Sequence, residues 1–399
     1  MARYLRGRRI GALTDIGLFT GRNEHARFRW LREHDPVHRS VTDAGDVFYA
    51  LTRHDHVCAV ANDADDFVSG RGTQIANKRA EGHGAPSVHN ADGTVHAELR
   101  RAGQGALRRR MITDRAPRIR AVIENLIDAA PRGEPFDFVA EIAVKIPMIV
   151  ISDVLGVPDR MQMQLVDWAN TMSDVRATDA EQADNRARLF GYFRELAAAK
   201  RRDPGDDVAS RLVRAHVEGR LMEDDYLDAF FMVLTVAGNE TTRFLLAGGL
   251  EELCRRPDQM AWLRAAGAEG RKGAVEEMVR WVSPVIHMRR TAVRDRDLFG
   301  TPIRAGDKVV LYFSAANRDP RVFGDTAEEL VLARSPNPHV GFGYGPHFCL
   351  GAQLARLETR LFWDVFCERI GQVELADGLG ERLPSHWFAG LTELRVVWS

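Results

Sequence analysis

The sequence predicts a mainly α-helical protein with a small β-rich portion. Apolar residues recur at helical spacing through most of residues 96–255, whereas strand-like runs are confined to residues 47–52 and the last third of the chain. No linker rich in Pro, Gly or Ser, no low-complexity block and no internal repeat interrupts this pattern. We therefore expect a single domain over residues 1–399.

The N-terminal quarter is expected to combine short elements with one long loop. Residues 24–34 are expected to form a helix, and the run Val-Phe-Tyr-Ala-Leu-Thr at 47–52 predicts a strand because β-branched and aromatic residues favour strands. Residues 70–94 are rich in Gly, Asn and Ser, which favours a long loop.

Helical periodicity dominates the middle of the chain, and strands return near its end. The helices are expected over residues 96–110, 115–130, 137–155, 159–174, 181–200, 206–216, 224–255 and 274–282. Further strands are expected at 286–293, 308–312 and near 391–398.

Composition and charge exclude several classes of function. The chain has 399 residues, of which 45% are hydrophobic and 28% charged, with a net charge of −1, so nothing favours nucleic acid or an acidic membrane surface as a partner. The four cysteines are scattered without metal-type spacing, which favours a reduced, cytoplasmic setting. No apolar run of about 18 residues occurs, so we expect no membrane anchor.

Cys349 lies at the end of a glycine-dense loop, Gly341-Phe-Gly-Tyr-Gly-Pro-His-Phe-Cys349-Leu-Gly351. Apolar residues recur at helical spacing directly behind it, so Cys349 is expected near a helix N-terminus. Unpaired backbone N–H groups and the helix dipole at such a position lower the pKa of a thiol. Glycines let a flat group pass close to the backbone, and a thiolate beneath a flat group suits an axial ligand of haem iron.

Other interpretations of this loop remain open from the residues alone. Cys349 could be a buried core cysteine. A dinucleotide-binding loop is disfavoured because the third glycine of its fingerprint is replaced by Pro346 or Phe348. A nucleophilic cysteine with His347 as its base lacks an evident orienting group nearby.

The longest apolar helix carries a polar segment in its middle, Ala237-Gly-Asn-Glu240-Thr241-Thr. A glutamate within an apolar helix is costly unless it is paired or faces water. One interpretation places Glu240 on an exposed stripe, with the Thr241 hydroxyl bonded to the carbonyl four residues earlier.

The segment Phe342-Gly-x-Gly-x-His347-x-Cys349-x-Gly351 resembles the haem-binding signature of the cytochrome P450 family. The resemblance implies the fold of that family, with haem b held between the long central helix and the helix behind the cysteine loop. It also implies that Cys349 is the axial ligand of the iron, with Phe342, Gly343 and Gly351 next to the cofactor.

The central helix is similar to the family's (Ala/Gly)-Gly-x-(Asp/Glu)-Thr motif over Ala237–Thr241. This similarity implies that Ala237 lies against the haem and that Glu240 and Thr241 deliver protons to dioxygen. A hydroxyl that receives protons from a carboxylate suits that role, because the carboxylate can control the access of water and bulk water would divert the reaction.

Seven ionisable residues match further positions of the family, although each alone is more often a surface residue. The family implies that His96, Arg100, Arg290 and His347 bind the two haem propionates. It further implies that Glu277, Arg280 and Arg334 form a buried structural network, whose members must satisfy one another.

The resemblance implies a haem-thiolate monooxygenase of the soluble, bacterial type, which inserts one atom of O2 into a hydrophobic small molecule by hydroxylation or epoxidation. A ferredoxin or flavodoxin is expected to supply electrons by docking near Arg100, Arg108, Arg109 and Arg110, a basic cluster that could also be only a solvated helix face.

The substrate pocket is expected to be apolar, which suits a steroid, lipid or terpenoid substrate. Its walls are expected to include Leu234, Val236, Val285, Ile286 and Phe388. The alternatives are a haem-thiolate peroxygenase or isomerising enzyme, which has less need of Glu240 and Thr241, and a haem-based sensor.

Overall fold

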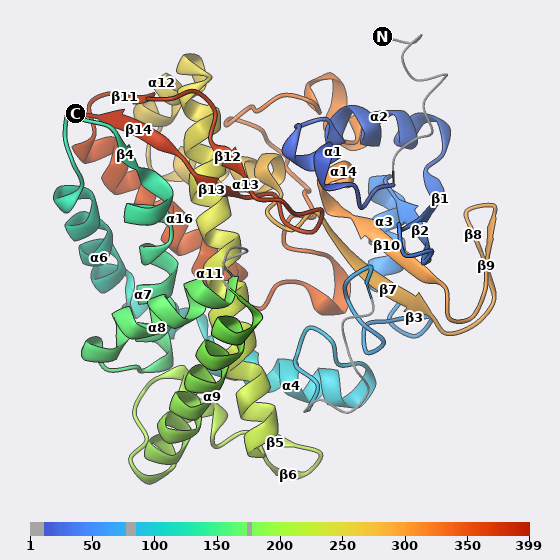
Figure 1. Ribbon diagram of the computed structural model, residues 1–399, viewed down its shortest axis with the longest axis horizontal. Coiled ribbons are helices and arrows are strands. Elements are labelled where there is room, and N and C mark those ends of the chain that lie inside the picture. Colours follow the sequence, from blue (N-terminus) through green and yellow to red (C-terminus); the bar gives the residue numbers. More distant parts are fainter. Residues whose placement is uncertain (1–11, 77–84, 174–177) are drawn as a thin grey trace.

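Helices fill most of the molecule, and the largest sheet lies to one side of them (Figure 1). The computed structural model describes residues 12–76, 85–173 and 178–399. Part of the loop predicted over 70–94 therefore lies outside the described residues. The prediction of a mainly helical fold with a small β-rich portion is confirmed.

The helices follow one another from the N-terminus with few strands between them. They are α1 (Ile16–Thr20), α2 (Glu24–His34), α3 (His54–Asn62), α4 (Gly93–Ala106), α5 (Arg109–Asp114), α6 (Ala116–Ala129), α7 (Lys145–Leu155), α8 (Asp159–Ser173), α9 (Asp179–Arg202), α10 (Val208–Leu212), α11 (Asp224–Cys254), α12 (Pro257–Ala265), α13 (Ala268–Val282), α14 (Phe313–Ala316), α15 (Pro320–Phe323) and α16 (Ala352–Arg369).

Five strands form the main sheet in the order β1 (Val37–Val41), β2 (Val47–Leu51), β10 (Lys308–Tyr312), β7 (His287–Ala292) and β3 (Phe67–Val68). β10 is buried along its whole length, pairs parallel with β2 and pairs antiparallel with β7. This pairing brings the N-terminal part of the chain beside the segment that precedes the cysteine loop. Strands β4 (Phe136–Asp137), β11 (Val373–Leu375) and β14 (Arg395–Trp398) form a smaller sheet.

Helix α11 runs through the middle of the molecule, as its apolar sequence predicts (Figure 1). Its 31 residues span about 46 Å at the usual helical rise. Asp224 and Asp225 lie in its first turn, where their negative charges interact favourably with the positive end of the helix dipole. α11 packs against α7, α9, α13 and α16, so its central segment faces the cysteine loop that leads into α16.

Several predicted boundaries differ from the structure. The helix predicted over 137–155 begins instead with the short strand β4 and a π-helical turn at Val139–Ala143, before α7 starts. The helix predicted over 206–216 is only α10, because Glu218 and Gly219 adopt positive φ angles of 53° and 73° and turn the chain into a hairpin.

Candidate functional site

A cavity lies between the middle of α11 and the cysteine loop. It is lined from α11 by Leu234, Ala237 and Thr241, and from the opposite side by Cys349 and its loop. The other predicted residues that line it are Arg100, Val285, Arg290, Phe342, Gly343, His347 and Gly351. Segments far apart in the sequence therefore meet at one site.

The cysteine loop holds its shape through glycines and one backbone hydrogen bond. Gly343 and Gly345 have positive φ angles of 76° and 69°, a conformation that residues with a Cβ rarely adopt. A Cβ at Gly345 would also lie 2.7 Å from the carbonyl oxygen of Ala61. The Cys349 N–H donates to the Phe342 carbonyl at 2.8 Å, which closes the loop and leaves the cysteine side chain facing the cavity.

Some of the surroundings of Cys349 raise the pKa of its thiol, and others lower it. The Cys349 side chain is exposed to the space of the cavity, but the surrounding protein shields it from bulk water and so raises the pKa of its thiol, while the backbone N–H groups of Gly351 and Ala352 and the charge of Arg100 lower it. Helix α16 starts at Ala352, so the predicted helix N-terminus is present. The backbone donors therefore act on the thiol as the sequence predicts, but burial is the largest influence and the pKa of Cys349 is raised.

The polar segment of α11 combines features of both interpretations. The Thr241 hydroxyl donates to the Ala237 carbonyl at 2.8 Å, as the structural interpretation predicts, but Thr241 also lines the cavity. Glu240 is 9% exposed, so the exposed stripe expected by that interpretation is wrong. Glu240 does not line the cavity. Burial lowers the pKa of Arg243, and the nearby charge of Glu240 acts in the opposite direction.

Arg100, Arg290 and His347 line one edge of the cavity, whereas His96 does not line it but stacks on His347. The rings of His96 and His347 stack with centroids 4.0 Å apart. Burial, then the charge of Arg290, lowers the pKa of His347 to about 2, and burial with Arg100 lowers that of His96, so both rings are neutral. Arg290 is almost fully buried, and burial lowers its pKa to about 10, which leaves it charged at neutral pH.

This edge has the charge and the free donors that two propionates require. In the part of the chain that the structure describes, neither Arg100 nor Arg290 forms an ion pair, and His96 Nε2 and His347 Nδ1 have no hydrogen-bond partner. Buried cations and donors of this kind are normally paired. A thiol facing the same cavity completes the donor set for haem b, so the residues present fit that cofactor.

The predicted structural network is formed as expected from the sequence. Arg280 donates to both carboxylate oxygens of Glu277 at 2.7 Å, and both side chains are fully buried. Arg334 Nε donates to Glu277 at 3.0 Å. Glu277 also accepts from the backbone N–H of Val331 and from Asn337, so the network ties α13 to the segment that leads to the cysteine loop.

Three residues predicted in the pocket wall do not line this cavity. Val236 is on α11 but is turned away from the stripe formed by residues 234, 237, 238 and 241. Ile286 lines a different cavity, because it alternates with Val285. Phe388 pairs with Val285 through the backbone, but its ring packs on Phe244 at 5.8 Å.

Two features of the site were not predicted. Glu358 on α16 lines the cavity, is 3% exposed and has an unpartnered Oε2, and burial raises its pKa well above the usual range. Asp92 accepts from the backbone N–H groups of Ser69 and Gly70 at 2.7 and 2.6 Å, and the Ser69 hydroxyl lies 3.3 Å from His347 Nε2. Both depend on contacts between segments that are distant in the sequence.

A wider opening of about 930 Å³ adjoins the cavity. Thr73, His89 and Val233 line both spaces, and Phe190 and Met232 add apolar surface to the opening. No helix in the described ranges is both long and apolar enough to cross a membrane.

Comparison with known proteins gives a consistent result. The family model "Cytochrome P450" matches residues 272–365. A steroid C26-monooxygenase of Mycolicibacterium smegmatis is 34% identical, over 93% of this chain and 92% of the relative. A linalool 8-monooxygenase of Pseudomonas putida is 32% identical, over 96% of this chain and 98% of the relative.

Solved structures agree with the sequence relatives. The Mycobacterium marinum cytochrome P450 CYP268A2, solved in complex with pseudoionone, is 32% identical and superposes with a TM-score of 0.89, over 98% of this chain and 99% of that one. The match extends over almost the whole length of both chains. The chain belongs to the cytochrome P450 family and is a monooxygenase.

Proposed function

We propose that this chain is a haem-thiolate monooxygenase with haem b in the cavity between α11 and the cysteine loop, and with Cys349 as the axial ligand. The observation that carries this proposal is the position of Cys349, which faces the cavity opposite the α11 segment around Thr241. When bound, the haem supplies activation of O2, helped by electron donation from the thiolate.

The chain's own residues would hold the cofactor from its edge and from both faces. Arg100 and Arg290 would bind the propionates as charged donors, and His96 and His347 as neutral donors. Ala237 on α11 would contact one face, while Phe342, Gly343 and Gly351 would border the other.

We propose that Thr241 passes protons to the oxygen-binding side of the cavity, with Glu240 controlling their supply. The Thr241 hydroxyl proton is engaged with the Ala237 carbonyl, so the oxygen lone pairs are free to accept a hydrogen bond from the cavity. To donate a proton, the hydroxyl must rotate away from that carbonyl. Glu240 is buried beside Arg243 and must turn or act through water to reach Thr241.

Thr241→Ala is expected to keep the haem but to divert electrons from product to hydrogen peroxide. General acid–base groups contribute about 10²–10⁴-fold to such steps, so we expect the fraction of NAD(P)H that yields product to fall at least about tenfold. The measurement is product and peroxide formed per NAD(P)H consumed. Thr241→Ser, which keeps a hydroxyl, is the matched control and should retain most of the coupling; unchanged coupling in Thr241→Ala would exclude the relay.

We propose a hydrophobic substrate of steroid, lipid or terpenoid type. The cavity walls are apolar, with Leu234 and Leu245 on α11 and Val285 and Met288 near the start of β7, and the wider opening beside the cavity adds Phe190 and Met232. Such walls bind apolar molecules through burial of surface. The relatives named for steroid and linalool oxidation, and the neighbour solved with pseudoionone, support the same class.

We further propose that Arg108, Arg109 and Arg110 attract an acidic ferredoxin or flavodoxin. All three are exposed where α4 gives way to α5, and Arg110 forms a long ion pair of 3.6 Å with Asp114. Arg100 lines the cavity instead, so the proposed docking cluster is limited to the other three residues. Charges of this kind mainly raise the association rate.

Replacing Arg108, Arg109 and Arg110 by glutamine is expected to slow electron delivery about tenfold at low salt, with little effect at high salt. The measurement is ferredoxin-supported turnover across ionic strengths. A triple glutamine variant of Arg188, Arg201 and Arg202, which are exposed on α9, is the matched control. The same loss in both variants, or none in the first, would contradict the proposed docking position.

A further inference from the structure

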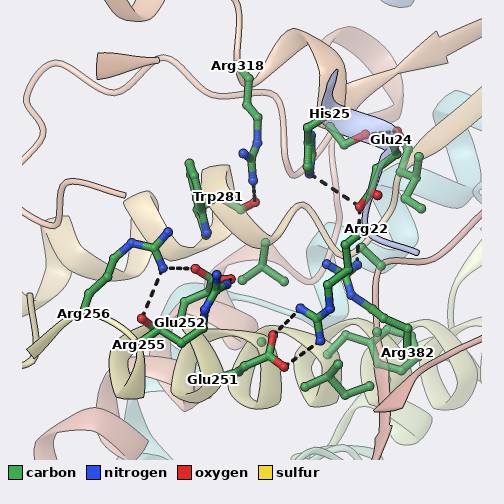
Figure 2. Close-up of a pocket in the computed structure, with 18 residues that line it drawn as sticks. Arg22, Glu24, His25, Glu251, Glu252, Arg255, Arg256, Trp281, Arg318 and Arg382 are labelled. Atoms are coloured by element: carbon green, nitrogen blue, oxygen red, sulfur yellow. Dashed lines mark hydrogen bonds and ion pairs between the residues drawn. The ribbon is translucent and has the colours of Figure 1, made fainter. Parts of the chain in front are cut away.

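A second cavity, rich in charged side chains, lies beside the C-terminal part of α11, whereas the opening described above lies beside its N-terminal part. Its volume is about 250 Å³, whereas one water molecule occupies roughly 30 Å³. It shares no lining residue with the cavity between α11 and the cysteine loop. Its walls come from the start of α2, the C-terminal part of α11, the end of α13 and the segment around Gly390. Figure 2 shows how the charged side chains surround it.

The cavity carries an excess of positive charge. Five arginines and three glutamates line it, which leaves two positive charges. His25 adds none, because burial and then the charge of Arg318 lower its pKa well below the usual range. The charged residues are Arg22, Arg255, Arg256, Arg318, Arg382, Glu24, Glu251 and Glu252.

Two of the glutamates are already well paired and stabilise the walls. Arg22 donates to both oxygens of Glu251 at 2.7 Å. Glu252 accepts from Arg255 at 2.9 Å and also pairs with Arg256. These contacts explain part of the cluster as ordinary structural ion pairs.

Arg382 and Arg318 are not satisfied in this way. The Arg382 side chain makes no hydrogen bond within the described ranges, and its nearest carboxylate oxygen, on Glu24, is 3.6 Å away. Arg318 is 8% exposed, its Nε has no partner, and its carboxylate neighbour Glu328 lies 3.7 Å away while accepting from Arg32 at 2.7 Å.

The position of the Arg318 side chain is constrained by the residues around it. The Arg318 guanidinium lies 3.6 Å from the centre of the Trp281 ring and donates to the Trp281 carbonyl at 3.3 Å. Figure 2 shows Arg318 entering the cavity from one side, with His25, Arg22 and Arg382 along a second side. Arg318 is buried and Arg382 is half-buried, and each forms a long ion pair, of 3.7 and 3.6 Å, so a ligand that satisfies both guanidinium groups would bind with an electrostatic gain.

We propose that this cavity binds a small phosphorylated compound, whose phosphate dianion is held between Arg318 and Arg382. Guanidinium groups match the geometry of phosphate oxygens, and a dianion balances the excess of two positive charges. The volume exceeds what a phosphate alone fills, and Phe244, Ile286 and Leu391 provide apolar surface for an organic substituent. Glu24, with an unpartnered Oε2, can accept a hydrogen bond from a hydroxyl of that substituent.

Isothermal titration of the haem-loaded protein tests this proposal. Inorganic phosphate and glycerol phosphate are titrated separately, with sodium chloride at matched ionic strength as the reference. We expect saturable binding of one equivalent of each, and tighter binding of glycerol phosphate if the apolar wall and Glu24 take part. Phosphate heats equal to those of chloride would overturn the proposal.

Substitutions test whether phosphate binds in this cavity. Arg382→Gln is expected to weaken phosphate binding about tenfold or more, Arg382→Lys less, and Glu24→Gln to strengthen it by removing a repelling carboxylate. Arg304→Gln removes an exposed arginine paired with Asp295 outside the cavity and should leave binding unchanged. Equal affinity in the wild type, Arg382→Gln and Glu24→Gln would overturn the proposal. If Arg382→Gln does not fold, Arg382→Lys and Glu24→Gln decide the outcome.

Discussion

Cys349→Ser is expected to abolish both substrate turnover and the red-shifted Soret band of the reduced, CO-bound protein. That band depends on a thiolate ligand, and an alcohol in its place is a far weaker donor to the iron. The Cys349 side chain faces the cavity, and the hydrogen bond from its N–H to the Phe342 carbonyl holds it in place. The measurement is the reduced CO difference spectrum, together with the haem content of the purified protein.

Cys367→Ser, on the helix that follows the cysteine loop, is the matched control. Cys367 lies on α16, away from the cavity lining, and burial raises the pKa of its thiol. This variant should keep the red-shifted band and turnover. A normal band in Cys349→Ser, or its loss in both variants, would contradict the assignment of Cys349 as the axial ligand.

Glu277→Gln is expected to lower the free energy of unfolding by about 3–5 kcal/mol, since it leaves two buried arginines without their counter-charge. Arg280 is fully buried, donates to Glu277 with two hydrogen bonds and is also bonded to the carbonyls of Asn317 and Ala327. Arg334 would lose its carboxylate partner at the same time. The loss should extend to haem retention, because this network anchors the segment before the cysteine loop.

Chemical denaturation of the purified variants measures this effect. Glu269→Gln is the control on the same helix, because Glu269 is exposed and its pair with Lys272 contributes little. We expect Glu269→Gln to change the free energy of unfolding by less than about 1 kcal/mol. Similar stabilities for the two variants would show that the buried network does not stabilise the fold.

The sequence predicted those parts of the site that depend on local patterns. Cys349 with its glycines, the apolar run of α11, and Glu277 with Arg280 are each recognisable within a few residues, and the structure places all of them as expected. The small strand pairings and the hairpin after α10 were missed, because they depend on positive φ angles and on partners elsewhere in the chain.

Positions that depend on rotation of one element against another were predicted less well. Val236, Ile286 and Phe388 are apolar neighbours of cavity residues, but the turn of the helix or strand points them elsewhere. Glu358 was missed for the same reason, since its burial against the cavity follows from the packing of α16. The net effect on the Cys349 pKa also needed the folded protein, because burial outweighs the backbone donors that the sequence reveals.

The most direct test of the account is oxidation of a bound substrate under ¹⁸O-labelled O2. A substrate is first found by titrating steroids, lipids and terpenoids against the haem-loaded protein and recording the spin-state shift of the Soret band. With NAD(P)H, a ferredoxin reductase and a ferredoxin, we predict that the product contains one ¹⁸O atom from O2. A product that forms without O2 and electrons, or that carries no label from O2, would contradict the assignment of this chain as a monooxygenase.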